Sequence, residues 1–242
     1  MKLITSVIIA IAFVCGIWIA ANAYRSRSAV NETITVTGSA DKDFISDLIV
    51  WKGSYSRKSM DLKSAYAALK SDETAIRNFL SAKGVANDQM VFSAIDINKE
   101  FNYETDANGR SLGQRFTGYN LTQTVRIESP EVNKINDISR QATELIEQGI
   151  EFSSQAPMFY YTKLTDIKMD LLAKASADGK QRAEIIAKNA GSSPGKLMKA
   201  TLGVFQITGK NTNEDFSYGG TFNTSSLNKT GSITIRMEFA VK

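Results

Sequence analysis

The sequence predicts an α+β fold in which a mainly antiparallel sheet is covered by three helices. Three observations support this class: segments that alternate between apolar and polar residues, segments with apolar residues at helical spacing, and turn residues between them. The expected order of elements is ββαβ-βαβ-αββ, after one N-terminal hydrophobic helix. With 242 residues and an apolar fraction of 43%, the chain is large enough to form a hydrophobic core.

Residues 1–23 are predicted to be a signal peptide or a membrane anchor. Leu3–Ala21 contain no charged side chain, and as a helix they would extend about 28 Å, close to the ~30 Å hydrocarbon core of a bilayer. Ala21-Asn22-Ala23 fits the A-x-A pattern of signal-peptidase cleavage, but the length of the apolar segment favours a retained anchor. Either alternative exports the remainder, which we divide into a linker at 24–32 and one domain at 33–242.

Two strands and a helix are expected at the start of this domain. Glu32–Val36 alternate in polarity, and Asp47–Ser56 follow as a more apolar segment, so we predict that they pair with each other. The helix has Gly84 as its C-terminal stop, and Asp72 and Glu73 interrupt its apolar stripe. The stripe consists of Leu62, Ala65, Tyr66, Leu69, Ile76, Phe79 and Leu80.

The residue pattern in the middle of the chain predicts a strand pair, a helix and a further strand. Met90–Glu104 and Arg115–Glu128 are expected to pair around a bend at Asn108-Gly109. The helix has Ser129 as its N-cap, Pro130 at its first position and Gly149 at its end. Its apolar face consists of Ile135, Ile138, Ala142, Leu145 and Ile146, and Ile150–Thr162 return as a strand.

A third helix is predicted from about Thr165 to Ala190. Small residues dominate its inward stripe, which lets the helix axis lie close to a sheet. The stripe consists of Leu172, Ala175, Ser176, Gly179, Ala183, Ile186, Ala187 and Ala190. Lys196–Thr208 then predict strand structure, and a polar loop spans Lys210–Lys229. The last strand alternates, with Ile233, Ile235, Met237, Phe239 and Val241 on one face.

The composition excludes several classes of function. The chain has no histidine and a single cysteine, Cys15, so it cannot form a Ser-His-Asp triad, a Cys-His pair, a His-bound zinc site or a disulfide within the chain. We interpret Cys15 as a buried apolar residue that fills space in the N-terminal segment. The net charge of +4 is small and its basic residues are dispersed, which argues against nucleic-acid binding.

The segment Gly191–Lys196 resembles two catalytic motifs without matching either. Gly191-Ser192-Ser193-Pro194-Gly195 fits G-x-S-x-G, but a nucleophile elbow follows a strand and needs a histidine. A phosphate-binding loop needs a longer spacing, a Ser or Thr after the lysine and a helix that follows. Because the segment comes after a predicted helix, we expect a structural turn.

Other candidate sites also favour structural interpretations. Glu104, Asp106, Asn108 and Gly109 resemble the start of a calcium loop, but Arg115 stands where a bidentate Glu is required, so a hairpin turn is expected. Asp41, Asp43 and Asp47 lie at the predicted first turn, where solvated acids are the more common case. Phe159, Tyr160 and Tyr161 alternate between the faces of a strand, which favours core or subunit packing over a ligand platform.

Several segments together resemble the SIMPL domain family, formerly DUF541, which includes a 26 kDa periplasmic antigen of Brucella and a periplasmic protein of Escherichia coli. The segments are ITVTGSADKDFISD, FSAIDI, GYNLTQTVRI, LLAKASADGKQRAEIIAKNAG followed by PGKLMKA, and TGSITIRMEF. They span about Thr33 to Lys242, although Ser46 stands where the family usually has proline. The resemblance implies export to the bacterial envelope, self-association, a link to stress tolerance and no established catalytic residue.

These observations predict a non-enzymatic envelope protein that acts by oligomeric assembly or partner binding. We expect a homo-oligomer, held at the periplasmic side of the inner membrane by the N-terminal segment or released there after cleavage. We assign no catalytic, cofactor-binding or metal-binding residue. Two alternatives remain: a small-ligand or peptide-binding module that uses the polar loop around Phe216, Tyr218 and Phe222, and a hydrolase that uses carboxylates alone.

Overall fold

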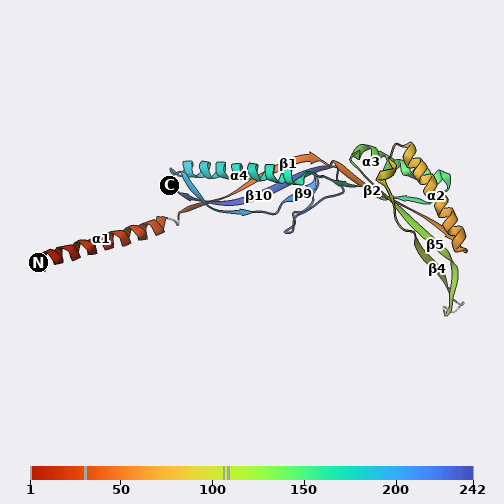
Figure 1. Cartoon of the computed structure of the whole chain (residues 1–242), viewed down its shortest axis with the longest axis horizontal. Helices are drawn as coiled ribbons and strands as arrows, with labels where there is room; N and C mark the ends of the chain where they lie inside the picture. Colours follow the sequence, from red (N-terminus) through yellow and green to blue (C-terminus); the bar gives the residue numbers. More distant parts are fainter. Residues whose placement is uncertain (1, 30–31, 106, 108–109, 242) are drawn as a thin grey trace.

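The computed structural model describes residues 2–29, 32–105, 107 and 110–241, without the side chains of residues 2–10, 25–29, 105 and 111. The molecule is elongated, with helix α1 (Lys2–Ala29) at one end and two lobes along its long axis (Figure 1). The first lobe contains β1 (Thr33–Ile45), α4 (Leu164–Asn189), β8 (Pro194–Leu202), β9 (Gln206–Gly209) and β10 (Asn228–Val241).

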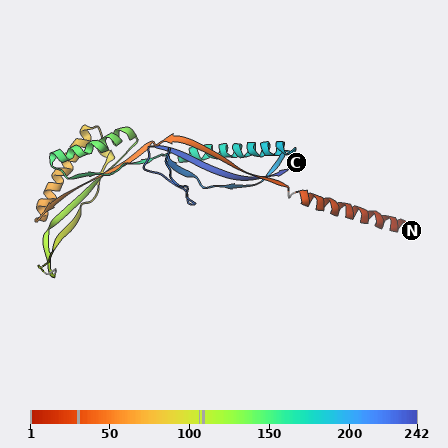
Figure 2. The same ribbon diagram turned by 180° about the vertical axis from the view of Figure 1, so that it is seen from behind.

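The second lobe is formed by the chain between β1 and α4. Its elements are β2 (Leu48–Ser59), α2 (Leu62–Ala82), the 3-10 helix η1 (Asn87–Gln89), β3 (Met90–Phe92), β4 (Asp96–Thr105), β5 (Ser111–Ser129), α3 (Val132–Gln141), the 3-10 helix η2 (Ala142–Gln148), β6 (Phe152–Ser154) and β7 (Met158–Tyr160). The first lobe is therefore built from two segments that are distant in sequence. Seen from behind, the β4–β5 hairpin projects from the end of the molecule opposite α1 (Figure 2).

The strands form two sheets, and the named strands pair antiparallel. One sheet has the order β1-β10-β8, with β9 also paired to β10; the other has the order β3-β5-β2-β6, with β4 on β5 and β7 on β2. The predicted α+β class with antiparallel strands is confirmed. The single sheet that we expected is in fact divided between the lobes.

The predicted pairing between the first two strands is wrong. β1 pairs with β10, whereas β2 pairs with β5. The connection lacks the glycine of a tight hairpin turn, and it is fastened to other segments: the Ser46 N–H donates to the Leu227 carbonyl and the Asp47 N–H to the Tyr160 carbonyl, both at 3.0 Å. The chain therefore passes from one sheet into the other.

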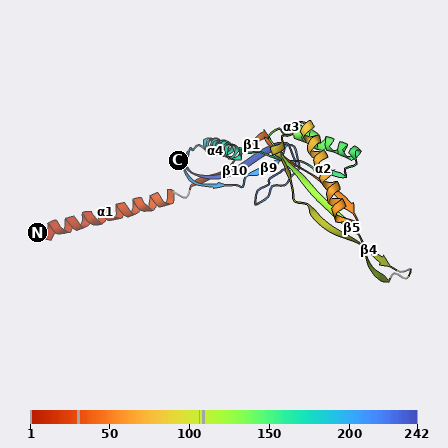
Figure 3. The ribbon, with the colours of Figure 1, turned by 45° about the vertical axis from the view of Figure 1, so that its right-hand side comes forward.

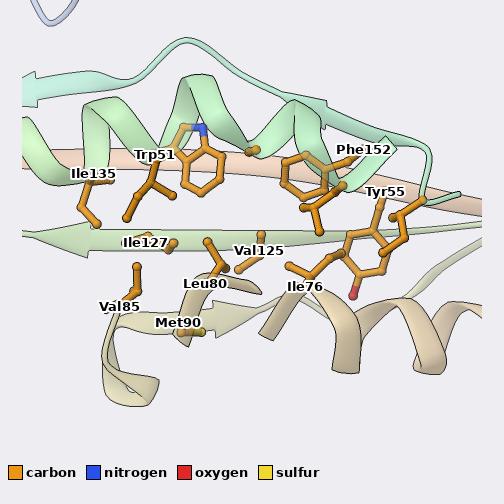
Figure 4. Packing of buried hydrophobic residues seen from close by; sticks show 14 of the residues in the cluster. Trp51, Tyr55, Ile76, Leu80, Val85, Met90, Val125, Ile127, Ile135 and Phe152 are labelled. Atoms are coloured by element: carbon orange, nitrogen blue, oxygen red, sulfur yellow. The ribbon is translucent and has the colours of Figure 1, made fainter. Parts of the chain in front are cut away.

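The core of the second lobe lies between its sheet and the helices α2 and α3. Figure 4 shows Trp51 and Tyr55 of β2 with Ile76 and Leu80 of α2, and each of these side chains is at most 1% exposed. The polar ends of the two large aromatic residues are satisfied, because Trp51 Nε1 donates to Ser154 Oγ at 3.0 Å and Tyr55 OH donates to Gln123 Oε1 at 2.6 Å.

The helix α2 lies where the sequence predicts it, but its buried face differs from the predicted stripe. Leu62 and Tyr66 were expected on the buried face and are 37% and 48% exposed. Ala65, Leu69, Ile76 and Leu80 are buried, and Gly84 follows the helix with φ of 83°. Asp72, which interrupts the apolar stripe, also lies on the buried face. It is held there by Arg57 of β2, whose Nε and Nη2 donate to the carboxylate at 2.5 and 2.7 Å.

The segment after β5 departs from the prediction in three ways. Ser129 is the buried end of β5 and not a helix N-cap; its Oγ accepts from the Glu131 N–H, and α3 begins only at Val132. The helix tightens into η2 before Gly149, and Ile146 is 56% exposed because the 3-10 geometry turns it away from the core. The strand expected at Ile150–Thr162 is two short strands, β6 and β7.

Before β5, the strand expected at Met90–Glu104 is likewise divided into two strands, β3 and β4.

The helix α4 covers β1 and β10, as predicted from its small residues (Figure 3). Ala175, Gly179, Ala183 and Ala187 are buried against the sheet, together with Ile235, Met237 and Phe239 of β10. Two residues of the predicted inward stripe are exposed. Ile186 is 49% exposed because its side of the helix projects past the edge of the sheet at β1, and Ala190 is exposed because it follows the last residue of the helix, Asn189.

The N-terminal helix α1 continues through residues 24–29, which we had assigned to a linker. The side chains described in α1, residues 11–24, are all exposed. Cys15 is among them, so the burial expected for it is wrong, because α1 packs against no other described element. In the part of the chain that the structure describes, no helix combines the length and apolar character needed to cross a membrane.

Candidate interaction surfaces

The segment Gly191–Lys196 is a helix C-terminus followed by a strand. Gly191 has φ of 74°, and the Ser192 N–H donates to the Ala187 carbonyl at 2.9 Å. β8 starts immediately afterwards, at Pro194. The predicted structural turn is confirmed, since no helix follows that could present N–H groups to a phosphate.

The calcium-loop candidate lies at the tip of the β4–β5 hairpin. Asp106, Asn108 and Gly109 are outside the described residues. Glu104 forms an ion pair with Arg115 across the hairpin, with Oε1 and Nε 2.9 Å apart. Within the described ranges there is no cluster of three or more His, Cys, Asp or Glu side chains that would hold a metal ion.

The three acidic residues near the first turn do not act together. Asp47 accepts hydrogen bonds from the N–H and Oγ1 of Thr162, both at 2.7 Å, and so fastens the connection between the lobes. Asp43 is 2.8 Å from Lys210 Nζ, and this hydrogen-bonded cation lowers the pKa of the Asp43 carboxyl. Of the three, only Asp41 has a side chain without a hydrogen bond or ion pair to the rest of the described chain.

The aromatic residues of β7 contribute to packing, as the alternation predicted. Phe159 is 7% exposed in the core of the second lobe. Tyr161 packs against Phe44 with ring centroids 4.8 Å apart, and Tyr160 lies 6.5 Å from the ring of Phe222. These rings join the two lobes and do not form a common ligand platform.

Among the strands that the structure describes, the sheet of the first lobe has one unpaired strand edge on each side. β1 pairs with β10 on one side only, and so does β8. On β1, the outward N–H of Ser39 donates to the Asp178 carboxylate of α4 at 2.8 Å, which covers one position. β9 is protected differently, because Ile207 exchanges backbone hydrogen bonds with Thr221 and Asn223 of the following loop. Among the described residues, the free edges are thus β1, apart from the position of Ser39, and the length of β8.

Exposed apolar side chains lie at both free edges, on helix α4 beside β1 and on β8 itself. Beside β1, the side chains of Ile185 and Ile186 line a groove of about 420 Å³ together with Arg182 and Thr35 to Thr37. On β8, Leu197, Met198 and Leu202 are 44%, 48% and 56% exposed. They are exposed because α4 covers β1 and β10 and leaves most of β8 uncovered. The sequence of β8 alone does not show that this strand lies at the edge of its sheet.

The polar loop between β9 and β10 is fastened by two buried polar residues that sequence reasoning missed. Gln206 and Lys229 are 7% and 1% exposed. Lys229 Nζ donates to the carbonyl oxygen of Asn223 at 2.6 Å, and Gln206 binds the backbone of Ser217 and Thr221. The burial of Lys229 could have been predicted from the alternation of β10, because Lys229 lies on the same face of the strand as the apolar residues from Ile233 onward.

A comparison with known families decides the classification. The model of the SIMPL family, described as a protein of unknown function (DUF541), matches residues 34–237. The chain belongs to the SIMPL family. The SIMPL match spans both lobes, from β1 to β10, so the two lobes belong to one family unit. No curated protein matches the chain.

Proposed function

We propose that this SIMPL protein is a non-enzymatic scaffold of the bacterial envelope that acts by self-assembly through the free edges of β1 and β8. The observation that carries the proposal is the presence of two unpaired edges on opposite sides of one sheet, each with exposed apolar side chains. An unpaired edge with exposed apolar residues is a ready template for a strand of another chain.

The topology favours head-to-tail assembly. β1 and β8 both run antiparallel to β10, so they run in the same direction. When β8 of one copy lies beside β1 of the next, the two strands are parallel and the α4 helices stay on one face. Leu197, Met198 and Leu202 would then lie close to Ile185 and Ile186 of the neighbour. Such heterologous contacts form a closed ring where the rotation between copies closes.

The absence of histidine and the engagement of acidic side chains support a non-enzymatic role. Asp72 is bound by Arg57, Asp43 by Lys210, and Asp170 by Lys42 at 2.7 Å. These carboxylates stabilise the fold through charge-assisted hydrogen bonds. A carboxylate-only hydrolase would instead place two acids across a cleft at about 5–9.5 Å, and we nominate no such pair.

The proposed location in the envelope rests on the N-terminal segment. Ile11, Phe13, Ile17 and Trp18 of α1 are 55–71% exposed, and an apolar surface of this kind favours a binding partner or a lipid environment. We propose that α1 directs the chain to the periplasm, either as a retained anchor or as a cleaved signal. Cell fractionation with sequencing of the mature N-terminus distinguishes these outcomes, and a cytoplasmic chain with an intact N-terminus contradicts both.

Light scattering of the full-length protein after size-exclusion chromatography tests the assembly. We expect the wild type to form oligomers, and we expect the double variant Ile186→Glu with Leu202→Glu to be a monomer, because the added charges would be buried between copies. Ile146→Glu is a matched control, since Ile146 and Leu202 are both 56% exposed and Ile146 lies in the other lobe. A wild type that stays monomeric at about 100 μM contradicts the proposal.

A further inference from the structure

The first lobe has a trough on the face of its sheet opposite α4. The trough has a volume of about 410 Å³. Its floor is formed by Ser39 and Asp41 of β1 and by Ser232 and Thr234 of β10. Ser39 is paired with Thr234, and Asp41 with Ser232, so the four side chains occupy neighbouring positions on one sheet face. None of the four side chains forms a hydrogen bond or ion pair with another described residue.

One wall of the trough is an exposed aromatic segment. Phe216 is 69% exposed and Tyr218 is completely exposed, and both line the trough. Exposed aromatic rings lose the packing that they would gain in a core, so two of them beside one trough indicate a contact surface.

The backbone between the two rings is held by a buried side chain. Gln206 Nε2 donates to the Ser217 carbonyl at 2.9 Å, and Gln206 Oε1 accepts from the Ser217 N–H at 3.4 Å and the Thr221 N–H at 2.6 Å. The Gln206 amide therefore binds Ser217 as a neighbouring strand would. Because the segment is fixed in the free protein, a ligand would not have to order it, which favours binding.

The charge of the trough selects the class of ligand. Asp41 is the only charged side chain among the described residues that line it. The neighbouring Asp43 is paired with Lys210, so that cation is already engaged. An unpaired carboxylate disfavours anions and attracts cations, and aromatic rings add attraction for ammonium groups. Apart from the polar floor, the lining is mainly apolar, which suits an ammonium ion with methyl or alkyl groups.

We propose that this trough binds an organic ammonium ion, with the cationic nitrogen beside Asp41 and its alkyl groups against Phe216 and Tyr218. The site lies on the sheet face away from α4, separate from the Ile185–Ile186 groove used in the proposed assembly. Choline binding and the oligomeric state are measured by different experiments, so the failure of one proposal is distinguishable from the failure of the other.

Choline and its uncharged analogue 3,3-dimethylbutan-1-ol test the proposal, because they share shape and differ in charge. With the full-length protein, ligand-observed NMR should show saturable binding of choline and at least about tenfold weaker binding of the alcohol. Asp41→Asn should weaken choline binding about tenfold. Asp215→Asn is the matched control, because it removes one carboxylate charge from an exposed residue next to Phe216 that does not line the trough, and it should bind choline as the wild type does.

A second pair of variants tests the rings without changing the charge. Phe216→Leu and Tyr218→Leu keep an apolar side chain and should each weaken choline binding by roughly threefold or more. Thermal unfolding of each variant verifies that it is folded. Equal binding of choline and the alcohol, wild-type affinity in Asp41→Asn, or no choline binding by the wild type at tens of millimolar overturns the proposal.

Discussion

Gly38 of β1 and Gly179 of α4 lie against each other where the helix crosses the sheet. A Cβ atom on Gly38 would lie 2.1 Å from the Ala175 carbonyl oxygen and 2.6 Å from the Gly179 nitrogen. A Cβ on Gly179 would lie 2.1 Å from Cε of Met237 and 3.3 Å from the Gly38 backbone. The close approach of α4 to its sheet therefore depends on two residues without side chains.

Alanine at these two glycines should have unequal effects. Gly38→Ala forces backbone atoms apart and should lower the free energy of unfolding by about 2–3 kcal/mol. Gly179→Ala should cost less, because the end of the Met237 side chain can move and alanine favours the helix by roughly 1 kcal/mol. Urea denaturation of both variants measures the difference. Gly219→Ala is the control, since its nearest contact would be at 3.9 Å; equal stability of all three variants would refute this explanation.

Removal of the Asp72 carboxylate should destabilise the second lobe. Asp72→Ala removes the carboxylate of α2 that pairs with the Arg57 guanidinium of β2. It should cost about 2 kcal/mol, below the 3–5 kcal/mol of a fully buried pair, because Arg57 remains partly exposed and keeps its hydrogen bond to the Gly149 carbonyl. Glu128→Ala breaks the exposed pair with Arg126, 2.5 Å apart, and should change stability by less than about 0.5 kcal/mol. Chemical denaturation compares the two, and similar losses would show that the position of Asp72 is not important.

The buried Lys229 should make stability depend on pH in the alkaline range. Burial lowers the pKa of the Lys229 ammonium from 10.5 to about 8. Between these values the unfolded chain holds the proton and the folded chain has released it, so the contribution of Lys229 to the free energy of unfolding rises with pH.

Comparison with Lys229→Met isolates this contribution from other titrating groups. The free energy of unfolding of the wild type relative to the variant should increase by about 3 kcal/mol between pH 7.5 and 10.5. Urea denaturation at several pH values measures it. A difference that stays constant over this range, or falls, contradicts the expected direction.

The loop between β9 and β10 should lose its order when Gln206 is replaced. Gln206→Met keeps the length of the side chain but removes the hydrogen bonds to Ser217 and Thr221, and should lower stability by about 1–2 kcal/mol. Amide hydrogen exchange should increase at Ser217 and Thr221 while the β1–β10 pairing stays protected. Gln114→Met on the exposed part of the β4–β5 hairpin is the control. Unchanged exchange at Ser217 would show that the loop is held by other contacts.

Much of the secondary structure could be predicted because it depends on local patterns. The apolar spacing in α2, the small residues of α4 and the alternation in β10 each appear within a short segment, and the elements lie close to where we expected them. Gly84, Gly149 and Gly191 end helices as expected because their positive φ angles are a local requirement.

The candidate surfaces were less predictable because they depend on contacts between distant segments. Asp72 and Lys229 are charged residues, for which the usual expectation is exposure. Arg57 lies 15 residues before Asp72, whereas the carbonyl oxygen that binds Lys229 belongs to the preceding polar loop. Asp41 and Ser232 become neighbours only through the β1–β10 register.

The sequence by itself determined the types of the elements, the family and the absence of histidine chemistry, since each follows from composition or from short-range pattern. Only the tertiary structure decided that β1 and β2 enter different sheets, that β1 and β8 keep free edges, and that Asp41 lies unpaired beside two exposed rings. The physical reason is that a strand's alternation specifies which side chains face the core, whereas its hydrogen-bonding groups are alike at every residue and carry no record of their partner.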